Sequence, residues 1–331
     1  MLAGGVPARP PFVFFDLETT GLSGGAGTYA FLVGCGWFEA GAFVTRQFVL
    51  TRIADEPALL AAVAADFSRA GSLVSFNGKS FDAPVLETRY LFHRLEWAAG
   101  RLPHVDVLHP ARRFWKRETC SLVALEQQVL DMRRTGDVPG FEIPARYFQF
   151  LRSGDARPLA DVLEHNRLDL VSLARLTARL LHLVGRGPGA AGDAQEALAL
   201  GHVYVRAGLE ARARDCYAEA IRSCRSPSAA FDPIRIEALR ALALAWRRAR
   251  QFDAAADCWR QLTDVRGCPR HILGEAAEAL AIHHEHRLRD LEGATTFALQ
   301  CLENESRQHR LARLGRKLGH FGTQKTPHSF W

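Results

Sequence analysis

The chain has 331 residues, of which 48% are hydrophobic and 24% are charged, and its formal net charge is +6. This composition is ordinary for a globular protein, and the length suggests two domains. No stretch approaches the ~18–20 uninterrupted apolar residues of a membrane helix. Residues 1–11 lack the apolar region of a secretory signal, so neither a membrane protein nor a secreted protein is expected.

Three apolar segments near the N-terminus predict strands, at residues 12–15, 29–37 and 42–49. Residues 39–41 have the composition of a hairpin turn between the second and third strands. The glycine-rich residues 21–27 form the loop between the first and second strands.

Strands then alternate with helices. Helical spacing over residues 55–70 ends at Gly71. Short apolar strands follow at residues 73–76 and 104–108, and a helix begins near Pro110. Three successive strands followed by this alternation predict an α/β fold, in which a mixed sheet is flanked by helices.

The second half of the chain has a different pattern. Residues 185–192 are rich in glycine and predict a linker, and no convincing strand follows. Six residues fall at the spacings of a tetratricopeptide repeat: Gly201, Tyr204, Gly208, Ala213, Tyr217 and Ala220. Trp246, Ala255 and Trp259 repeat the later part of this pattern, and a weaker copy spans residues 274–302. Stacked helical hairpins are predicted, with a generic helical bundle as the alternative.

The last 25 residues contain six basic residues and no acidic residue: Arg307, Arg310, Arg313, Arg316, Lys317 and Lys325. The four arginines are spaced by three, so they line one face of a helix. Such a face attracts phosphates; a solvated basic tail that binds nothing specific is the alternative. None of the seven cysteines lies in a Cys-x-x-Cys pair, so a zinc ribbon or redox motif is not supported and a cytoplasmic location is expected.

Two carboxylates end the first apolar strand. Asp16 and Glu18 are two residues apart, so in a strand their side chains point to the same side. A buried carboxylate without a partner is costly, and no Lys or Arg lies within residues 12–21. Hard oxygen ligands suit Mg²⁺ or Mn²⁺, so these residues are candidate metal ligands.

A third carboxylate, Asp82, follows the strand at residues 73–76 and is expected to begin a helix. We expect its neighbour Phe81 to be a core residue rather than a platform for stacking bases. Asn77 is expected either to orient a ligand or, as the safer interpretation, to cap the turn after the strand.

The fourth carboxylate, Asp169, lies four residues after His165, so both face one side of the helix predicted here. Together the four carboxylates and the histidine suit two-metal phosphoryl transfer, with His165 as general base. The simpler alternatives pair His165 with Glu164 or Asp161, and Asp169 with one of two arginines, Arg167 or Arg175.

Residues 16–22, 77–82 and 165–169 resemble the three exonuclease motifs of the DEDD superfamily, which has a ribonuclease H-like fold and contains 3′-to-5′ exonucleases. The resemblance spans roughly residues 12–183. Residues 24–34, 76–82, 137–140, 143–147 and 165–169 are similar to the YprB-like group, some of whose members carry tetratricopeptide-like C-terminal regions.

The resemblance implies that Asp16, Glu18, Asp82 and Asp169 hold two Mg²⁺ or Mn²⁺ ions and that His165 is the general base. The histidine branch of the superfamily usually has four residues between these last two positions, whereas this chain has three. A further acid, Asp106, occupies a strand-end position that is often acidic in such nucleases, where it would support the site or the fold. Thr19, Asn77 and Lys79 are expected to contact substrate.

The sequence therefore predicts an exonuclease domain over residues 1–184, a linker over 185–192, helical repeats over 193–306 and a basic tail over 307–331. The expected substrate is the 3′ end of single-stranded DNA or RNA, and the repeats would bind a protein partner or extend the nucleic-acid path. One alternative is a nucleic-acid-binding or adaptor protein without turnover. In another, the repeats are the main functional element and the nuclease serves a complex.

Overall fold

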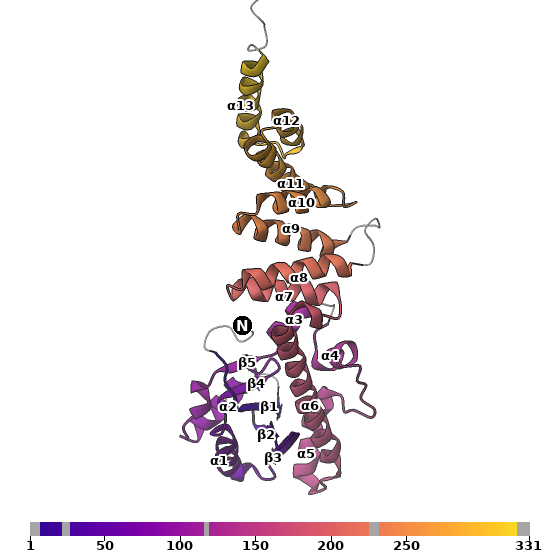
Figure 1. Cartoon of the computed structure of the whole chain (residues 1–331). Coiled ribbons are helices and arrows are strands. Elements are labelled where there is room, and N and C mark those ends of the chain that lie inside the picture. The colour runs from indigo at the N-terminus through magenta and orange to yellow at the C-terminus, as the bar shows by residue number, and fades with distance from the viewer. Residues whose placement is uncertain (1–6, 22–26, 116–118, 225–231, 323–331) are drawn as a thin grey trace, which may run out of the picture. The chain divides into compact units, whose positions relative to one another are not determined.

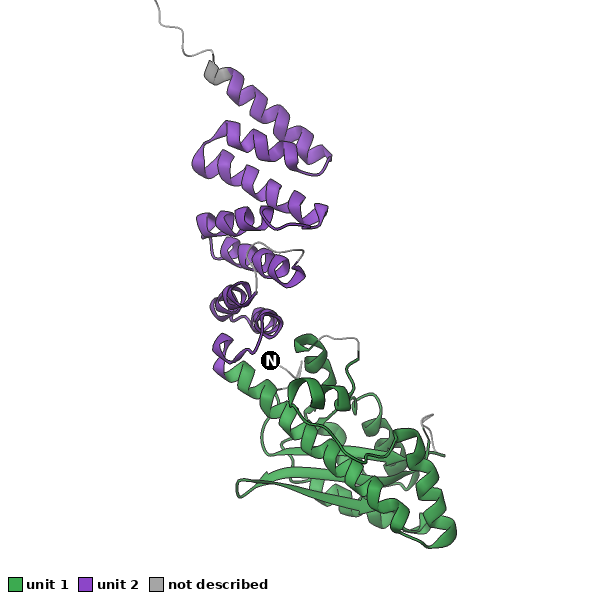
Figure 2. Ribbon diagram, turned by 90° about the vertical axis from the view of Figure 1, so that its right-hand side faces the viewer, with its two compact units in different colours: residues 1–185 green, residues 186–331 purple. Residues whose placement is uncertain are grey.

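The structure is a computed structural model, which describes residues 7–21, 27–115, 119–224 and 232–322 (Figure 1). The chain divides into two compact units, residues 1–185 and residues 186–331 (Figure 2). All seven cysteines are free thiols. In the part of the chain that the structure describes, no helix combines the length and the apolar character needed to cross a membrane.

Unit 1 contains one five-stranded sheet. Its strands are β1 (Phe12–Thr19), β2 (Ala30–Glu39), β3 (Ala42–Val49), β4 (Ser72–Ser75) and β5 (His104–Asp106). The strand order is β3-β2-β1-β4-β5, in which β1, β2 and β3 are antiparallel neighbours, and β4 and β5 run parallel to β1. The predicted mixed α/β sheet is confirmed.

The first strand is longer than its apolar run predicts. Phe14 and Phe15 are buried, but pairing with β2 continues through Asp16, opposite Gly34, and Glu18, opposite Leu32. Backbone pairing within a sheet does not require apolar side chains, so the strand extends into the acidic segment. The carboxylates therefore lie on the central strand of the sheet.

Six α-helices accompany the sheet in the described part of unit 1. They are α1 (Glu56–Phe67), α2 (Asp82–Phe92), α3 (Leu108–Phe114), α4 (Leu122–Val129), α5 (Ile143–Ser153) and α6 (Arg157–Arg186). Three short 3₁₀ helices lie between these elements, η1 (Ile53–Asp55), η2 (Ala98–Arg101) and η3 (Gly140–Glu142). Tyr147 of α5 stacks on Phe31 of β2 with the ring centroids 4.0 Å apart, which attaches α5 to the sheet.

Gly34 explains how α6 comes close to the sheet. A Cβ atom at this position would lie 2.2 Å from Oδ1 of Asn166 and 2.9 Å from a methyl group of Leu170. Only glycine leaves room for these two α6 side chains. This contact brings the part of α6 that contains His165 and Asp169 to the strand that carries Asp16.

The described part of unit 2 is helical throughout. It contains the 3₁₀ helix η4 (Pro188–Ala190), α7 (Ala194–Arg206), α8 (Glu210–Ser223), α9 (Pro233–Arg248), α10 (Phe252–Thr263), α11 (Arg270–His283), the π-helix η5 (His284–Leu288), α12 (Leu291–Gln300) and α13 (Glu305–Gly322). Tyr217 of α8 packs directly on Gly201 of α7. The prediction of an all-helical region is confirmed, whereas its assignment to tetratricopeptide repeats stays a prediction.

The basic residues of α13 pair with carboxylates of unit 2. Arg307 pairs with Glu303, and Arg310 pairs with Glu278. Arg313 and Lys317 both contact Glu285, whose side chain is fully buried. Arg310, Arg313 and Lys317 thus connect α13 to α11 and η5, so these three residues are not a freely solvated face. That the arginine face, which includes Arg316, attracts phosphates stays a prediction. Lys325 lies outside the described residues.

Candidate active site

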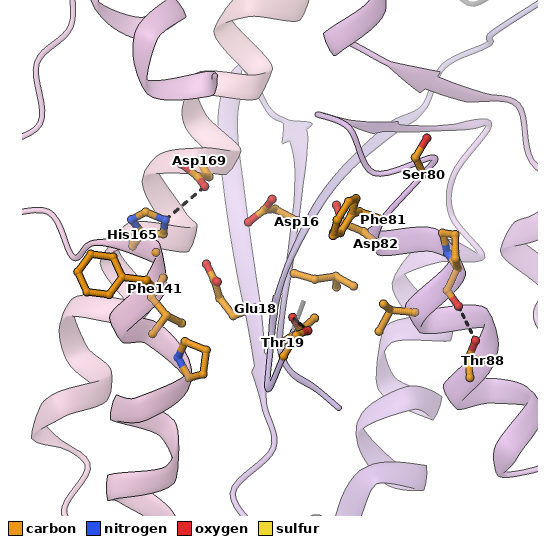
Figure 3. Close-up of a pocket in the computed structure, with 17 residues that line it drawn as sticks. Asp16, Glu18, Thr19, Ser80, Phe81, Asp82, Thr88, Phe141, His165 and Asp169 are labelled. Atoms are coloured by element: carbon orange, nitrogen blue, oxygen red, sulfur yellow. Dashed lines mark hydrogen bonds and ion pairs between the residues drawn. The ribbon is translucent and has the colours of Figure 1, made fainter. Parts of the chain in front are cut away.

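A pocket of about 720 Å³ in unit 1 brings together the five residues predicted for catalysis and metal binding (Figure 3). These are Asp16, Glu18, Asp82, His165 and Asp169. They come from β1, from the first residue of α2 and from α6. Segments more than 140 residues apart thus meet at one site, and the prediction that Asp82 begins a helix is confirmed.

An amide on α6 orients the carboxylate of Asp16. Asn166 donates a hydrogen bond from Nδ2 to Oδ2 of Asp16 at 2.9 Å. Its Oδ1 in turn accepts a hydrogen bond from Nε2 of Gln47 at 3.0 Å, which fixes the amide orientation. Asn166 is fully buried. No role was predicted for Asn166 from the sequence, because nothing local links it to a strand 150 residues away.

Burial and mutual repulsion oppose ionisation of the four carboxylates. Burial raises the pKa of Asp16 well above its ordinary value, and repulsion from Asp169, Asp82 and Glu18 raises it further. The same two causes raise the pKa of Glu18 to about 8 and that of Asp82 to about 7. Burial also raises the pKa of Asp169. Full ionisation of the four carboxylates would therefore place more negative charge in the pocket than its surroundings neutralise.

The donor set fits a divalent cation, because four carboxylates are hard oxygen ligands in a buried site. Among the residues that the structure describes, however, no three acidic, histidine or cysteine side chains lie close enough together to hold one ion. Two of the acids are held by other partners, since Asp16 bonds to Asn166 and Asp169 bonds to Arg134. A cation would therefore have to compete with Arg134 for Oδ1 of Asp169.

Arg134 is a residue of the site that sequence reasoning missed. It lies between α4 and η3, and only 5% of its side chain is exposed. Its guanidinium group pairs with Glu126, Asp137 and Asp169. Desolvation lowers the pKa of this group, but its carboxylate partners outweigh that effect and raise the pKa. Arg134 is thus a permanent cation beside the pocket.

The partners that the simpler alternatives proposed are wrong. Arg167 pairs with Glu164 at 2.6 Å on the surface of α6, and Arg175 contacts the sulfur atom of Met132. Asp161 pairs with Arg146 at 2.6 Å. None of these three side chains lines the pocket. Arg167 and Arg175 occupy other faces of α6, whereas Asp161, one turn before His165, pairs with Arg146 instead.

His165 lies between two carboxylates. Its Nδ1 is 2.7 Å from Oδ1 of Asp137, and its Nε2 is 3.6 Å from Oδ2 of Asp169. The sequence singled out Asp137 only as part of a family-like segment and gave it no function. The structure places it against the candidate base.

Asp106 organises the turn after β4. Its Oδ1 accepts hydrogen bonds from the backbone N–H groups of Asn77, at 2.8 Å, and Leu108, at 3.1 Å. Its Oδ2 accepts from the N–H group of Lys79 at 3.2 Å. Asp106 thus acts on the pocket through the turn that precedes Asp82, which agrees with the supporting role expected for it.

The three residues expected to contact substrate differ in position. Thr19 lines the pocket, and its hydroxyl group donates to the carbonyl oxygen of Gly21 at 3.0 Å. Asn77 and Lys79 are not among the pocket-lining residues. Asn77 has a positive φ of 65° within the turn, which fits the capping interpretation better than ligand orientation.

Two aromatic side chains are exposed at the pocket. Phe81 is 50% exposed and Phe141 is 83% exposed, and both line the pocket. In Figure 3 Phe141 lies beside His165, and Phe81 lies beside Asp82. The expectation that Phe81 is a core residue is wrong: it precedes the first turn of α2 and points to the pocket rather than into the sheet.

Comparison with known proteins agrees with this fold. The sequence profile of the RNase_H superfamily matches residues 13–181. The chain belongs to this superfamily. It is also 30% identical over 321 residues to a Bacillus subtilis (strain 168) protein named "Uncharacterized protein YprB", covering 92% of this chain and 74% of the relative. Membership of the RNase H superfamily indicates a nuclease-type function. Of the YprB-like segment at residues 24–34, residues 24–26 lie outside the described residues.

Proposed function

We propose that the protein is a metal-dependent nuclease of the 3′-to-5′ exonuclease type, which hydrolyses phosphodiester bonds of single-stranded DNA or RNA. The main support is the convergence of four carboxylates and one histidine on a single pocket of a ribonuclease H-like fold. The direction of digestion rests on the resemblance of the three acidic motifs to DEDD exonucleases.

Asp16, Glu18, Asp82 and Asp169 would hold two Mg²⁺ or Mn²⁺ ions. Bound divalent cations stabilise the negative charge that develops on the phosphate group and lower the pKa of a bound water molecule. The raised carboxylate pKa values support this assignment, because they reflect a lack of positive charge in a buried site.

His165 would accept the proton of the attacking water at Nε2. This nitrogen faces the carboxylate cluster, whereas Nδ1 is occupied by Asp137. A neutral imidazole has one nitrogen with a free lone pair, and its ordinary pKa lies near neutrality. Both properties suit a general base.

The exposed rings of Phe81 and Phe141 support an unpaired nucleic-acid end as the substrate. Aromatic side chains provide flat surfaces on which unpaired bases stack, at roughly 1–3 kcal/mol per base. Bases inside a duplex are already stacked and cannot make such contacts. The two rings therefore favour single strands without selecting a base.

A second candidate is a nucleic-acid-binding or adaptor protein that does not turn over its substrate. Two observations favour it: Arg134 pairs with Asp169, and in the described residues no three ligands converge on one point. In that case the pocket would bind nucleic acid without metal ions.

The test is hydrolysis of oligonucleotides labelled at the 3′ or the 5′ end, single-stranded and duplex, with Mg²⁺, Mn²⁺ or EDTA. We expect metal-dependent release of nucleotides from single-stranded 3′ ends. Asp16→Ala should lower the rate by about a hundredfold or more, because charge stabilisation by a metal ion is worth several kcal/mol. Asp161→Asn, which removes an exposed carboxylate of the same unit, is the matched control and should retain activity.

Absence of metal-dependent cleavage by the wild type, or equal cleavage by Asp16→Ala, would contradict the proposal. Binding of the single strand without cleavage would favour the adaptor alternative. Release of nucleotides from the 5′ end would support a nuclease but contradict the proposed 3′-to-5′ direction.

A further inference from the structure

We propose that Asp137 and Arg134 are positioning residues, which hold His165 as the Nδ1–H tautomer and direct its Nε2 lone pair to the carboxylate cluster. This inference rests on the proposed function, in which His165 is the base. Neither residue touches the pocket as a metal ligand would, so both act through other side chains.

The first step of the argument is the hydrogen bond between His165 and Asp137. Oδ1 of Asp137 is 2.7 Å from Nδ1 of His165, and it also accepts from the N–H group of Val138 at 2.9 Å. An ionised carboxylate only accepts hydrogen bonds, so Nδ1 must carry the proton. In a neutral ring Nε2 is then left with its lone pair.

The second step concerns the charge of Asp137. Partial burial raises the pKa of this carboxyl group, but the hydrogen bond with His165 and the Arg134 guanidinium outweigh that effect and hold the pKa below its ordinary value. Asp137 is thus ionised throughout the neutral range and keeps its role as acceptor.

The third step is the geometry of Arg134. Its Nε is 2.8 Å from Oε2 of Glu126, and Nη2 contacts the other oxygen, which makes a two-point contact with that carboxylate. Nη1 is 3.1 Å from Oδ2 of Asp137, and Nη2 also contacts Oδ1 of Asp169. Such two-point contacts fix the plane of the guanidinium group.

These contacts close a ring of four side chains: Arg134, Asp137, His165 and Asp169. Asp169 competes with Asp137 for the proton of His165, because Oδ2 of Asp169 is only 3.6 Å from Nε2. If Asp137 were absent, Asp169 would be the acceptor that remains in this ring of side chains. A hydrogen bond to Asp169 would place the proton on Nε2 and remove the lone pair that the reaction needs. Arg134 weakens this competition by pairing with Asp169, while Asp137 holds the proton on Nδ1.

The ring also accounts for the spacing of the third motif. With three residues between them, His165 and Asp169 lie almost above each other on α6, so the competing contact is inherent in the helix. An orienting carboxylate from outside the helix resolves it. The loop between α4 and η3 supplies that carboxylate together with its arginine.

The first experiment measures the tautomer of His165 in the metal-free wild type. Nitrogen-15 NMR at about pH 8 distinguishes the two tautomers of a neutral histidine, and His165→Gln assigns the signal. We expect the Nδ1–H form to dominate. A dominant Nε2–H form would overturn the proposal. This measurement needs no hydrolysis, so it separates a failure of this inference from a failure of the proposed nuclease function.

The second experiment uses Asp137→Asn. An amide offers one acceptor oxygen, whereas Arg134, the N–H group of Val138 and Nδ1 of His165 all donate at this position. We expect the tautomer population to shift toward Nε2–H and kcat to fall by about 10- to 100-fold. KM and Mn²⁺ affinity, followed by electron paramagnetic resonance, should stay at their wild-type values because the ligands are intact.

The control Asp161→Asn changes a residue of α6, the helix that carries His165, and should change neither the tautomer of His165 nor kcat. An unchanged tautomer and unchanged kcat in Asp137→Asn would overturn the proposal. A loss of Mn²⁺ affinity in parallel with kcat would overturn it too, because it would show a general structural role instead of orientation of one ring.

Discussion

At the residue scale, the charge of the pocket determines how its carboxylates ionise. Glu18 has a pKa of about 8 against an ordinary 4.5, and Asp82 has a pKa of about 7 against 3.8. Burial is the largest cause for both, followed by the neighbouring acids. In the unfolded chain these causes vanish, so the unfolded state loses its protons at lower pH than the folded state.

The stability of the metal-free protein should therefore fall as the pH rises from about 4 to about 8, because the folded state binds more protons throughout this range. The loss of stability caused by Glu18 and Asp82 is smallest below the pKa values of these groups in the unfolded chain, and it is complete above their pKa values in the folded protein. Mg²⁺ or Mn²⁺ should raise the melting temperature most at the upper end. Thermal unfolding in EDTA and in each metal, across this pH range, measures both effects.

Glu18→Gln is the matched variant for this prediction, since the amide has nearly the same shape and does not titrate. This variant should weaken the pH dependence of stability and reduce the rise in melting temperature that metal ions cause. Wild-type and Glu18→Gln curves of equal slope would show that the cluster does not titrate as described.

At the scale of elements, a buried ion pair joins α1 to α2. Arg89 of α2 makes a two-point contact with Glu56, the first residue of α1, and both side chains are almost fully buried. The guanidinium group also lies over the ring of Tyr29, 4.4 Å from its centroid. Nε2 of His93 is 2.6 Å from the same carboxylate. This contact sets the position of α2, whose first residue is Asp82.

Arg89→Ala should lower the free energy of unfolding by about 3–5 kcal/mol, because it leaves the carboxylate of Glu56 buried without its main partner. Urea denaturation measures the change. The control is Arg101→Ala, since Arg101 pairs with Glu96 where both side chains are largely exposed, and its loss should cost at most about 1 kcal/mol. Equal effects of the two variants would contradict this account of the buried pair.

At the scale of the whole molecule, each unit has its own core. The five candidate catalytic and metal-binding residues all belong to unit 1. In unit 2 the carboxylate of Glu285 is fully buried and pairs with Arg313 and Lys317 of α13. The candidate site thus lies in unit 1, whereas the ion pairs of Glu285 stabilise unit 2.

Glu285→Gln should lower the stability of unit 2 by about 1–3 kcal/mol, because the amide places donors against two cations. Hydrolysis of a short oligonucleotide should be unchanged below the melting transition of unit 2. Calorimetry and the hydrolysis assay measure the two effects in the full chain. If Glu285→Gln lost hydrolysis while unit 2 is still folded, hydrolysis would depend on unit 2 as well, and this prediction would be wrong.

The sequence by itself determined the order and type of the main elements and the identity of the acids. Strand β3 occurs at the predicted residues 42–49, and Asp82 begins a helix as expected. These features depend on local periodicity and on turn residues, which the chain carries within a few positions. The acids were visible because polar residues at the end of an apolar strand are locally unusual.

Only the tertiary structure decided which charges meet. Arg134 lies in a segment without a recognisable motif, and Asp137 and Asn166 lie in motif-like segments that do not reveal their partners. Arg310 and Arg313 of α13 pair with carboxylates of their own unit. Contacts between distant segments depend on how helices pack on the sheet, as at Gly34, and electrostatic energy depends on distance and burial. The sequence therefore identified the acids of the pocket, and the fold determined which side chains surround His165.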